Sequence, residues 1–116
     1  MSGSTPEQAG LGPTGAVELL QGGAVLVDVR EDDEWVAGHA PQARHVPVSE
    51  IASAHSSLPQ DRVVICVCHL GGRSARAVAE LRACGLDARN LEGGMAAWAS
   101  AGLPVVDDLG RPGTIA

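Results

Sequence analysis

The sequence predicts an α/β domain in which a mainly parallel central sheet is flanked by helices. Short apolar runs alternate with helical segments along the chain, which is typical of strands joined by right-handed helical crossovers. The densest apolar run, residues 62–68 (RVVICVC), leads through one loop into the clearest helical pattern, residues 74–84. The length of 116 residues matches one domain, so a multidomain organisation is not expected.

The first half of the chain is expected to alternate helices with short strands. Thr14 is a candidate cap for the first helix, and the pair Gly22-Gly23 ends it. The valine-rich run that follows suits a strand buried on both faces, and the acidic residues after it suit the positive end of a helix. Ser49 is a candidate cap for the next helix. The expected elements are a helix at residues 14–21, a strand at 24–29, a helix at 31–37, a strand at 45–47 and a helix at 50–57.

The second half contains the strongest strand and helix patterns. Residues 62–68 are rich in Val, Ile and Cys, which favours a strand at the centre of the sheet. The helix after it has Val78 and Leu81 three residues apart and is followed by Gly85, a typical helix end. A strand at 88–91 and a helix at 95–101 complete a domain over residues 14–106, between flexible segments expected at 1–13 and 107–116.

Composition and charge narrow the possible functions. The chain is 45% hydrophobic and 19% charged, with a mean hydropathy of +0.09, which fits a globular domain rather than a disordered or membrane-embedded chain. The chain has eight cationic side chains, all Arg, and fourteen acidic ones. The resulting net charge of −6 argues against nucleic acid and membrane partners. Three cysteines form an odd number without a signal-peptide pattern, which favours a reducing, cytoplasmic setting.

Cys68 is the candidate nucleophile because of where its strand ends. Ligands of parallel sheets bind beyond the carboxyl ends of the strands, and Cys68 is expected to be the last residue of the central strand. The loop to the next helix brings backbone N–H groups to the sulfur, and Gly71 and Gly72 allow backbone angles that turn these groups inward. A pKa lowered by about two units, worth roughly 2.7 kcal/mol, leaves most of the thiol ionised near neutral pH. Several N–H hydrogen bonds of about 1.5–3 kcal/mol each are enough to supply this free energy.

Cys68, Gly71, Arg73 and Ser74 form a Cys-x-x-Gly-x-Arg-Ser run that resembles the active-site loop of the single-domain rhodanese-like sulfurtransferases. Further similar segments follow the family's order and extend the resemblance to roughly residues 14–106. They are Asp28-Val29-Arg30-Glu31, Gly38-His39-Ala40-Pro41, Glu92-Gly93-Gly94 through Trp98, and Gly102-Leu103-Pro104. The resemblance implies the rhodanese-like three-layer domain, with helices on both faces of the mainly parallel sheet.

The resemblance also implies a reaction. Cys68 would take a sulfane sulfur from a small-molecule donor such as thiosulfate, hold it as a persulfide, and pass it to a thiol or cyanide acceptor. No metal and no organic cofactor is expected. The alternative is a sulfur-relay or adaptor module that acts on a sulfur-accepting protein and has little turnover of its own.

The length of the loop bears on a second alternative. Four residues, 69–72, separate Cys68 from Arg73, as in the rhodanese-like sulfurtransferases. The related cell-cycle phosphatases and arsenate reductases carry one residue more, which makes a ring wide enough for a tetrahedral oxyanion. The shorter loop therefore favours a sulfur atom bonded to Cys68 over phosphate or arsenate chemistry.

Residues around Cys68 are expected to hold the loop and to set its preferences. Arg73 is expected to pair with a carboxylate, for which Asp28, Glu31 and Glu34 are candidates. Ser74 is expected to cap the helix and to face the sulfur. Asp28 and Arg30 are expected to brace the loop through hydrogen bonds. The persulfide-holding loop comprises His69, Leu70, Gly71, Gly72, Arg73 and Ser74, of which His69, Leu70 and Gly72 are expected to shape the choice of donor.

The other cysteines have competing interpretations. Cys66 lies two residues before Cys68, on the same side of the strand, and is expected to be packed rather than to act as a resolving thiol. Cys84 is expected to be structural. A zinc site of Cys66, Cys68, His69 and Cys84 is disfavoured because adjacent strand and loop positions do not converge tetrahedrally. The nucleophile hypothesis further requires that solvent reach Cys68.

Overall fold

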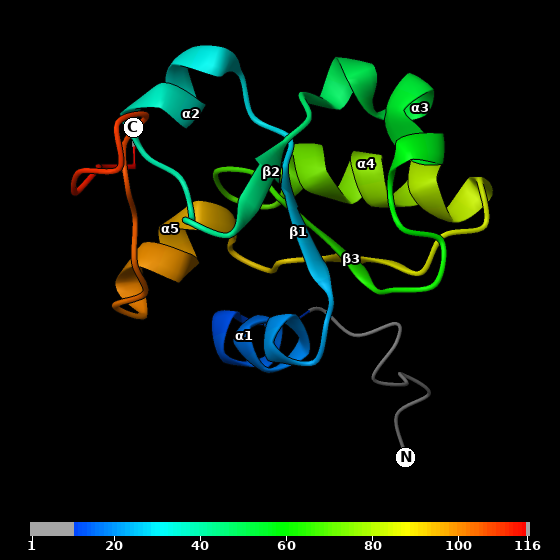
Figure 1. Ribbon diagram of the computed structural model, residues 1–116, viewed down its shortest axis with the longest axis horizontal. Helices are drawn as coiled ribbons and strands as arrows, with labels where there is room; N and C mark the ends of the chain where they lie inside the picture. The colour runs from blue at the N-terminus through cyan, green and yellow to red at the C-terminus, as the bar shows by residue number, and fades with distance from the viewer. Residues whose placement is uncertain (1–10, 116) are drawn as a thin grey trace.

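The computed structural model describes residues 11–115. Most of the segment expected to be flexible at the N-terminus, residues 1–10 of 1–13, lies outside the described residues. The chain alternates helices and strands as the sequence predicts (Figure 1). The helices are α1 (Pro13–Gln21), α2 (Asp32–Ala37), α3 (Ile51–Ala54), α4 (Gly72–Ala83) and α5 (Gly94–Ser100), with 3-10 turns η1 (Val48–Glu50) and η2 (His55–Ser57) on either side of α3. The strands are β1 (Val25–Asp28), β2 (Ala43–His45), β3 (Val64–Val67) and β4 (Ala88–Asn90).

The four strands form one parallel sheet in the order β2-β1-β3-β4. Strand β3 pairs with β1 on one side and β4 on the other, which confirms the prediction that the run around Cys66 lies at the centre. Cys68 itself follows the strand by one residue rather than ending it. In a parallel sheet the carboxyl ends of neighbouring strands share one edge, so the ends of β1, β3 and β4 converge beside Cys68.

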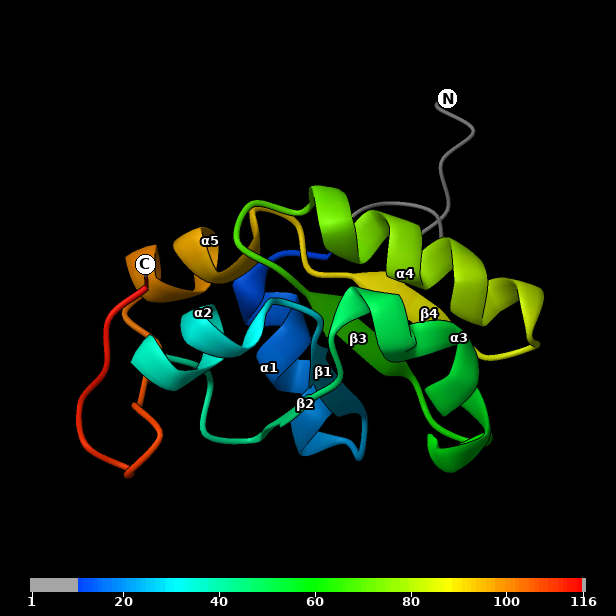
Figure 2. The same ribbon diagram turned by 90° about the horizontal axis from the view of Figure 1, so that it is seen from above.

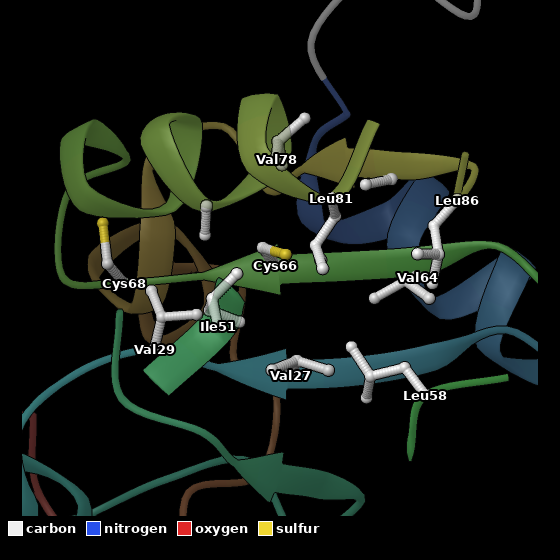
Figure 3. Packing of buried hydrophobic residues seen from close by; sticks show 12 residues of the cluster. Val27, Val29, Ile51, Leu58, Val64, Cys66, Cys68, Val78, Leu81 and Leu86 are labelled. Carbon is white, nitrogen blue, oxygen red and sulfur yellow. The ribbon is translucent and has the colours of Figure 1, made fainter. Parts of the chain in front are cut away.

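Helices cover both faces of the sheet, which gives the three layers that the sequence predicts (Figures 1 and 2). Side chains alternate along β3: Val64 and Cys66 belong to the core under α3 and α4, whereas Ile65 and Val67 belong to the core under α1 and α5. The first core continues to Cys68, which lies at the same end of the sheet as Val29 and Ile51 (Figure 3). The second core contains the fully buried Trp98.

Three expected helix caps are wrong, and each has a local reason. Helix α1 begins one residue before Thr14, because Pro13 lacks the N–H that the first helical position does not use. Ser49 lies inside the turn η1 and caps nothing. Ser74 is the third residue of α4, since Gly71 has a left-handed conformation (φ +119°) and occupies the cap position instead. The expected strand at 45–47 is formed two residues earlier, at Ala43–His45.

The segment after Pro104 is tied to the domain, although a flexible tail is the expectation for residues 107–116. The backbone N–H of Gly113 donates to the carbonyl of Val105, and that of Thr114 donates to Ala37. Ile115 packs against the core under α1 and α5. Over residues 11–115, no helix combines the length and apolarity that crossing a bilayer requires.

Candidate active site

Cys68 lies at the start of a tight loop between β3 and α4. The side chain points into the space under the first turns of α4, and Figure 3 shows its sulfur at that end of the helix. The loop turns back at Gly71, whose φ of +119° is a conformation that a residue with a Cβ rarely adopts. The spacing of the glycine therefore allows the backbone to wrap around the sulfur, as the sequence predicts.

Hydrogen-bond donors of this loop surround the sulfur. The N–H of Gly71 donates to Sγ of Cys68 at 3.1 Å, and the hydroxyl oxygen of Ser74 lies 3.3 Å from Sγ. Burial raises the pKa of Cys68, but the Ser74 hydroxyl and the N–H groups of Ser74, Gly71 and Arg73 together lower the pKa below its ordinary value. The loop thus favours a thiolate at position 68.

The first turn of helix α5 forms hydrogen bonds with the first residues of the loop. Its N–H groups at Met95 and Ala96 donate to the carbonyl oxygens of Cys68 at 2.7 Å and His69 at 3.1 Å. A Cβ on Gly94 would approach these two carbonyl oxygens to 2.4 Å, and its φ of +61° is left-handed. The Gly93-Gly94 pair therefore lets the helix dock closely onto the loop, and this contact fixes the direction in which Cys68 leaves the sheet.

Arg73 pairs with Glu34, one of the three carboxylates that the sequence offers. Its two terminal nitrogens donate to the two carboxylate oxygens at 2.7 and 2.9 Å, a bidentate geometry. Glu34 also accepts the backbone N–H of Glu31 and so completes a capping box at the start of α2. The pair ties α2 to the loop of Cys68, so Arg73 has a bracing position in the structure.

The pair predicts a pH-dependent contribution to stability. The hydrogen bond from Arg73 lowers the pKa of Glu34 from 4.5 to about 2, against the opposing effect of burial. A carboxyl with a lowered pKa in the folded chain stabilises it above the unfolded value, so this contribution is complete above pH 4.5 and is lost as the pH falls toward 2. In Glu34→Gln, we expect a free energy of unfolding lower by on the order of 1 kcal/mol at neutral pH, since Arg73 is 37% exposed and solvent screens the pair.

Urea unfolding of both proteins between neutral pH and pH 2 measures this difference. The gap between wild type and Glu34→Gln should close as the pH falls. Glu80→Gln is the matched control, because Glu80 makes an exposed ion pair of 4.0 Å with Arg76 on α4. A gap that is absent at neutral pH, or that stays constant down to pH 2, would contradict the role given to the pair.

Asp28 and Arg30, the two residues expected to brace the loop, form a buried pair with each other. Both side chains are fully buried, and Nη2 of Arg30 donates to Asp28 at 2.7 Å and to the carbonyl of Gly38 at 2.6 Å. Residues 69–74 are not among these partners in the described chain. The pair joins the end of β1 to the end of α2, the helix whose Glu34 pairs with Arg73 of the loop.

Asn90 is a site residue that the sequence analysis misses. It ends β4 and lies opposite Cys66 in the register of the sheet, which brings it beside the loop. Its side-chain oxygen lies 2.5 Å from the hydroxyl of Ser74, and its side-chain nitrogen donates to the carbonyl of Gly71 at 3.1 Å. A polar residue at the carboxyl end of the strand next to β3 is the signal that points to it.

The thiol of Cys68 is less open than the nucleophile hypothesis requires. The residue is 1% exposed, whereas Leu70 on the same loop is 69% exposed. A hollow of about 490 Å³ lies at the opposite end of β1 and β3, next to Gly23 and Arg62. In this structure the sulfur therefore has little direct access to solvent.

The other cysteines take no part in this arrangement. Burial, and then the neighbouring Cys68, raise the pKa of Cys66 to about 12, so it stays protonated near neutral pH. Cys84 is exposed at the far end of α4. Within residues 11–115, no group of three or more His, Cys, Asp or Glu side chains is arranged to bind a metal ion.

The order of these features along the chain agrees with a known family. The sequence matches the Rhodanese-like domain family over residues 13–101. This chain belongs to that family. A protein of Allochromatium vinosum named sulfurtransferase is 41% identical over 83 residues, covering 71% of this chain and 78% of the relative. The rhodanese-related protein of Thermoplasma volcanium superposes with a TM-score of 0.77 at 31% identity, covering 84% of this chain and 96% of that structure.

Several relatives are longer than this rhodanese-like domain. The chain spans 64% of an uncharacterised Synechocystis protein to which it is 34% identical. It spans 20% of the Mycobacterium tuberculosis protein MoeZ, which is named a probable adenylyltransferase/sulfurtransferase. The same domain therefore occurs both as most of a small protein and as one part of a larger one.

Proposed function

We propose that this rhodanese-like domain is a sulfurtransferase that carries a sulfane sulfur on Cys68 as a persulfide. The observation that carries the proposal is the sulfur of Cys68 within reach of a backbone N–H and a hydroxyl, at the carboxyl edge of the sheet. Donors of this kind stabilise a negative charge on sulfur, both on a thiolate and on the outer atom of a persulfide. The sulfurtransferase of Allochromatium vinosum supports the assignment.

Two displacements at sulfur complete the proposed cycle. The Cys68 thiolate attacks the outer sulfur of the donor, the donor S–S bond breaks, and the leaving group keeps the electron pair; from thiosulfate it departs as sulfite. An acceptor thiolate or cyanide then attacks the outer sulfur of the persulfide, and Cys68 leaves again as a thiolate. The N–H of Gly71 and the hydroxyl of Ser74 are positioned to stabilise the charge on Cys68 before the first step and after the second.

The charge of the loop bears on the donor. Arg73 is its only guanidinium, and both terminal nitrogens are engaged by Glu34. A dianion such as thiosulfate therefore meets no unpaired guanidinium in this loop, which favours donors of lower charge, such as a persulfide. A protein persulfide is also a donor of lower charge than thiosulfate. A relay role, in which sulfur comes from or goes to a protein, is therefore the second candidate.

Sulfur loading of the wild-type protein tests the proposal. After incubation with thiosulfate or, separately, with a low-molecular-weight persulfide, we expect the intact mass to increase by one sulfur atom and a reducing thiol to reverse the gain. Peptide mapping should place the added sulfur on Cys68. Sulfur found only on the exposed Cys84, or no loading by either donor, would overturn the proposal.

Turnover separates the two candidates. A sulfurtransferase of small molecules should pass sulfur to cyanide or a small thiol over many cycles. A relay should load with sulfur once, turn over near background with small acceptors, and discharge to a protein thiol. Rapid release of phosphate from an aryl phosphate would instead favour the phosphatase alternative over both.

A further inference from the structure

The hydroxyl of Ser74 faces more acceptors than it can serve. Its oxygen lies 2.5 Å from Oδ1 of Asn90, 3.2 Å from the carbonyl oxygen of Gly71 and 3.3 Å from Sγ of Cys68. A hydroxyl has a single proton to donate. The distances favour Asn90 as the acceptor, so the same proton is not available to the sulfur while this hydrogen bond exists.

The orientation of Asn90 is fixed by its second hydrogen bond. Its side-chain nitrogen donates to the carbonyl oxygen of Gly71 at 3.1 Å, and it also approaches a carboxylate oxygen of Glu92 at 3.5 Å. With the nitrogen turned toward these two acceptors, Oδ1 faces Ser74. Asn90 can therefore only accept from the Ser74 hydroxyl and never donate to it.

We propose that Asn90 is a positioning residue that competes with Cys68 for the proton of Ser74 and thereby controls how readily the thiol ionises. The inference concerns the same cysteine as the proposed function and rests on it only in treating Cys68 as the sulfur carrier. Asn90 acts through Ser74, because Ser74 is the residue that reaches both side chains.

The two protonation states of Cys68 use the Ser74 hydroxyl differently. In the thiol state, the S–H of Cys68 donates to the oxygen of Ser74, and Ser74 donates to Asn90, so every proton has one acceptor. When the thiol loses its proton to water, the thiolate needs a donor, and the Ser74 hydroxyl rotates from Asn90 to Sγ. Ionisation therefore requires that the hydrogen bond from Ser74 to Asn90 be broken. This requirement raises the pKa of Cys68, whereas the N–H groups of the loop lower it.

The other titratable groups near the loop do not account for the effect proposed for Asn90. Arg73 lies close enough to Cys68 for each to affect the pKa of the other group, but its charge is balanced by Glu34 from α2. Cys66 on β3 stays protonated, and Glu92 faces Asn90 from the segment after β4. His69 occupies the loop itself. None of these groups is itself substituted when Asn90 is replaced, so an effect on the ionisation of Cys68 that requires Ser74 reports on the Ser74 hydroxyl.

The experiment titrates Cys68 in a Cys84→Ser background through the ultraviolet absorbance of the thiolate. Cys66 does not interfere, because its pKa of about 12 lies above the range titrated. In Asn90→Leu we expect the pKa of Cys68 to fall by about one unit, since the Ser74 hydroxyl can donate to the thiolate without giving up a hydrogen bond to Asn90. In Ser74→Ala we expect the pKa to rise, because the shared donor is gone.

A double variant identifies the route. If Asn90 acts through Ser74, Asn90→Leu changes the pKa of Cys68 when Ser74 is present. The same substitution leaves the pKa of Cys68 unchanged in a protein that already carries Ser74→Ala. Asn90→Asp keeps an acceptor for Ser74, adds a negative charge and should raise the pKa. Both Asn90 variants lose the hydrogen bond to Gly71, so opposite shifts cannot come from that loss.

Equal effects of Asn90→Leu in both backgrounds, or a raised or unchanged pKa in Asn90→Leu itself, would overturn the inference. Asn90→Ala serves as a second variant if the leucine does not fit, with the same expected direction. The titration uses no sulfur donor, so its outcome is separate from sulfur loading. A protein that titrates as expected but does not load sulfur would keep the inference and lose the proposed function.

Discussion

Replacing the proposed nucleophile, Cys68→Ser, should abolish sulfur loading and lower turnover by about 10³-fold or more. A serine hydroxyl stays protonated near neutral pH and forms no S–S bond, so no covalent intermediate exists for the second step. The change removes one sulfur atom and keeps the shape of the side chain, and the N–H of Gly71 can still donate to the new oxygen. Intact mass after incubation with donor, together with steady-state turnover, measures both effects.

Cys84→Ser is the matched control for this prediction. Cys84 caps the far end of α4, is exposed, and lies outside the loop, so its loss should leave loading and turnover near wild type. Circular dichroism and thermal unfolding of both variants confirm that the fold is kept. If Cys68→Ser still gained a sulfur atom that a reducing thiol removes, a cysteine other than Cys68 would carry the sulfur.

The fold is predictable from the sequence chiefly because its two central strands, β1 and β3, lie in short apolar runs that alternate with helical segments. The alternation of Val64 and Cys66 with Ile65 and Val67 is compatible with a strand buried on both faces, and the structure places it between two cores. The helix starts are less predictable. A serine or threonine near a helix start suggests a cap, but Pro13 and Gly71 set the actual boundaries through their own backbone preferences.

The site is predictable where its contacts are local. Gly71 and Ser74 contact Cys68 within six residues along the chain, so the loop motif already contains them. The partners that come from other elements are harder to predict: Glu34 is 39 residues from Arg73, and Asn90 is 16 residues from Ser74. Their positions depend on the order of the strands and on the register of β4, which residue patterns do not specify.

Asp28 shows what a residue pattern leaves open about the partners of a buried charge. Its charge and its place at the end of β1 mark it as important, and the expectation is that it braces the loop of Cys68. The structure instead pairs it with Arg30, two residues away, through both carboxylate oxygens. Because Arg30 also reaches Gly38, the pair holds the connection between β1 and α2. Its main effect is therefore expected on stability.

Asp28→Asn should destabilise the fold by about 3–5 kcal/mol, since it leaves the guanidinium of Arg30 buried without its counter-charge. Both side chains are 0% exposed, and Nη1 of Arg30 already has no hydrogen-bond partner, so no other group compensates. For a domain whose total stability is on the order of 5–15 kcal/mol, this is a large fraction. We expect the thermal midpoint to fall by about 12 °C or more.

Two further variants separate the charge effect from a general loss of packing. Asp61→Asn makes the same chemical change at an exposed turn and should leave the midpoint within a few degrees of wild type. The double variant Asp28→Leu with Arg30→Met removes both charges, so it should cost less than Asp28→Asn alone. If the single variant were as stable as wild type, or the double variant less stable than the single one, the pair would not be the electrostatic unit that its hydrogen bonds describe. Unfolding in urea, followed by tryptophan fluorescence, distinguishes these outcomes, because the indole of Trp98 is fully buried in the folded chain and its N–H donates to the carbonyl of Pro104.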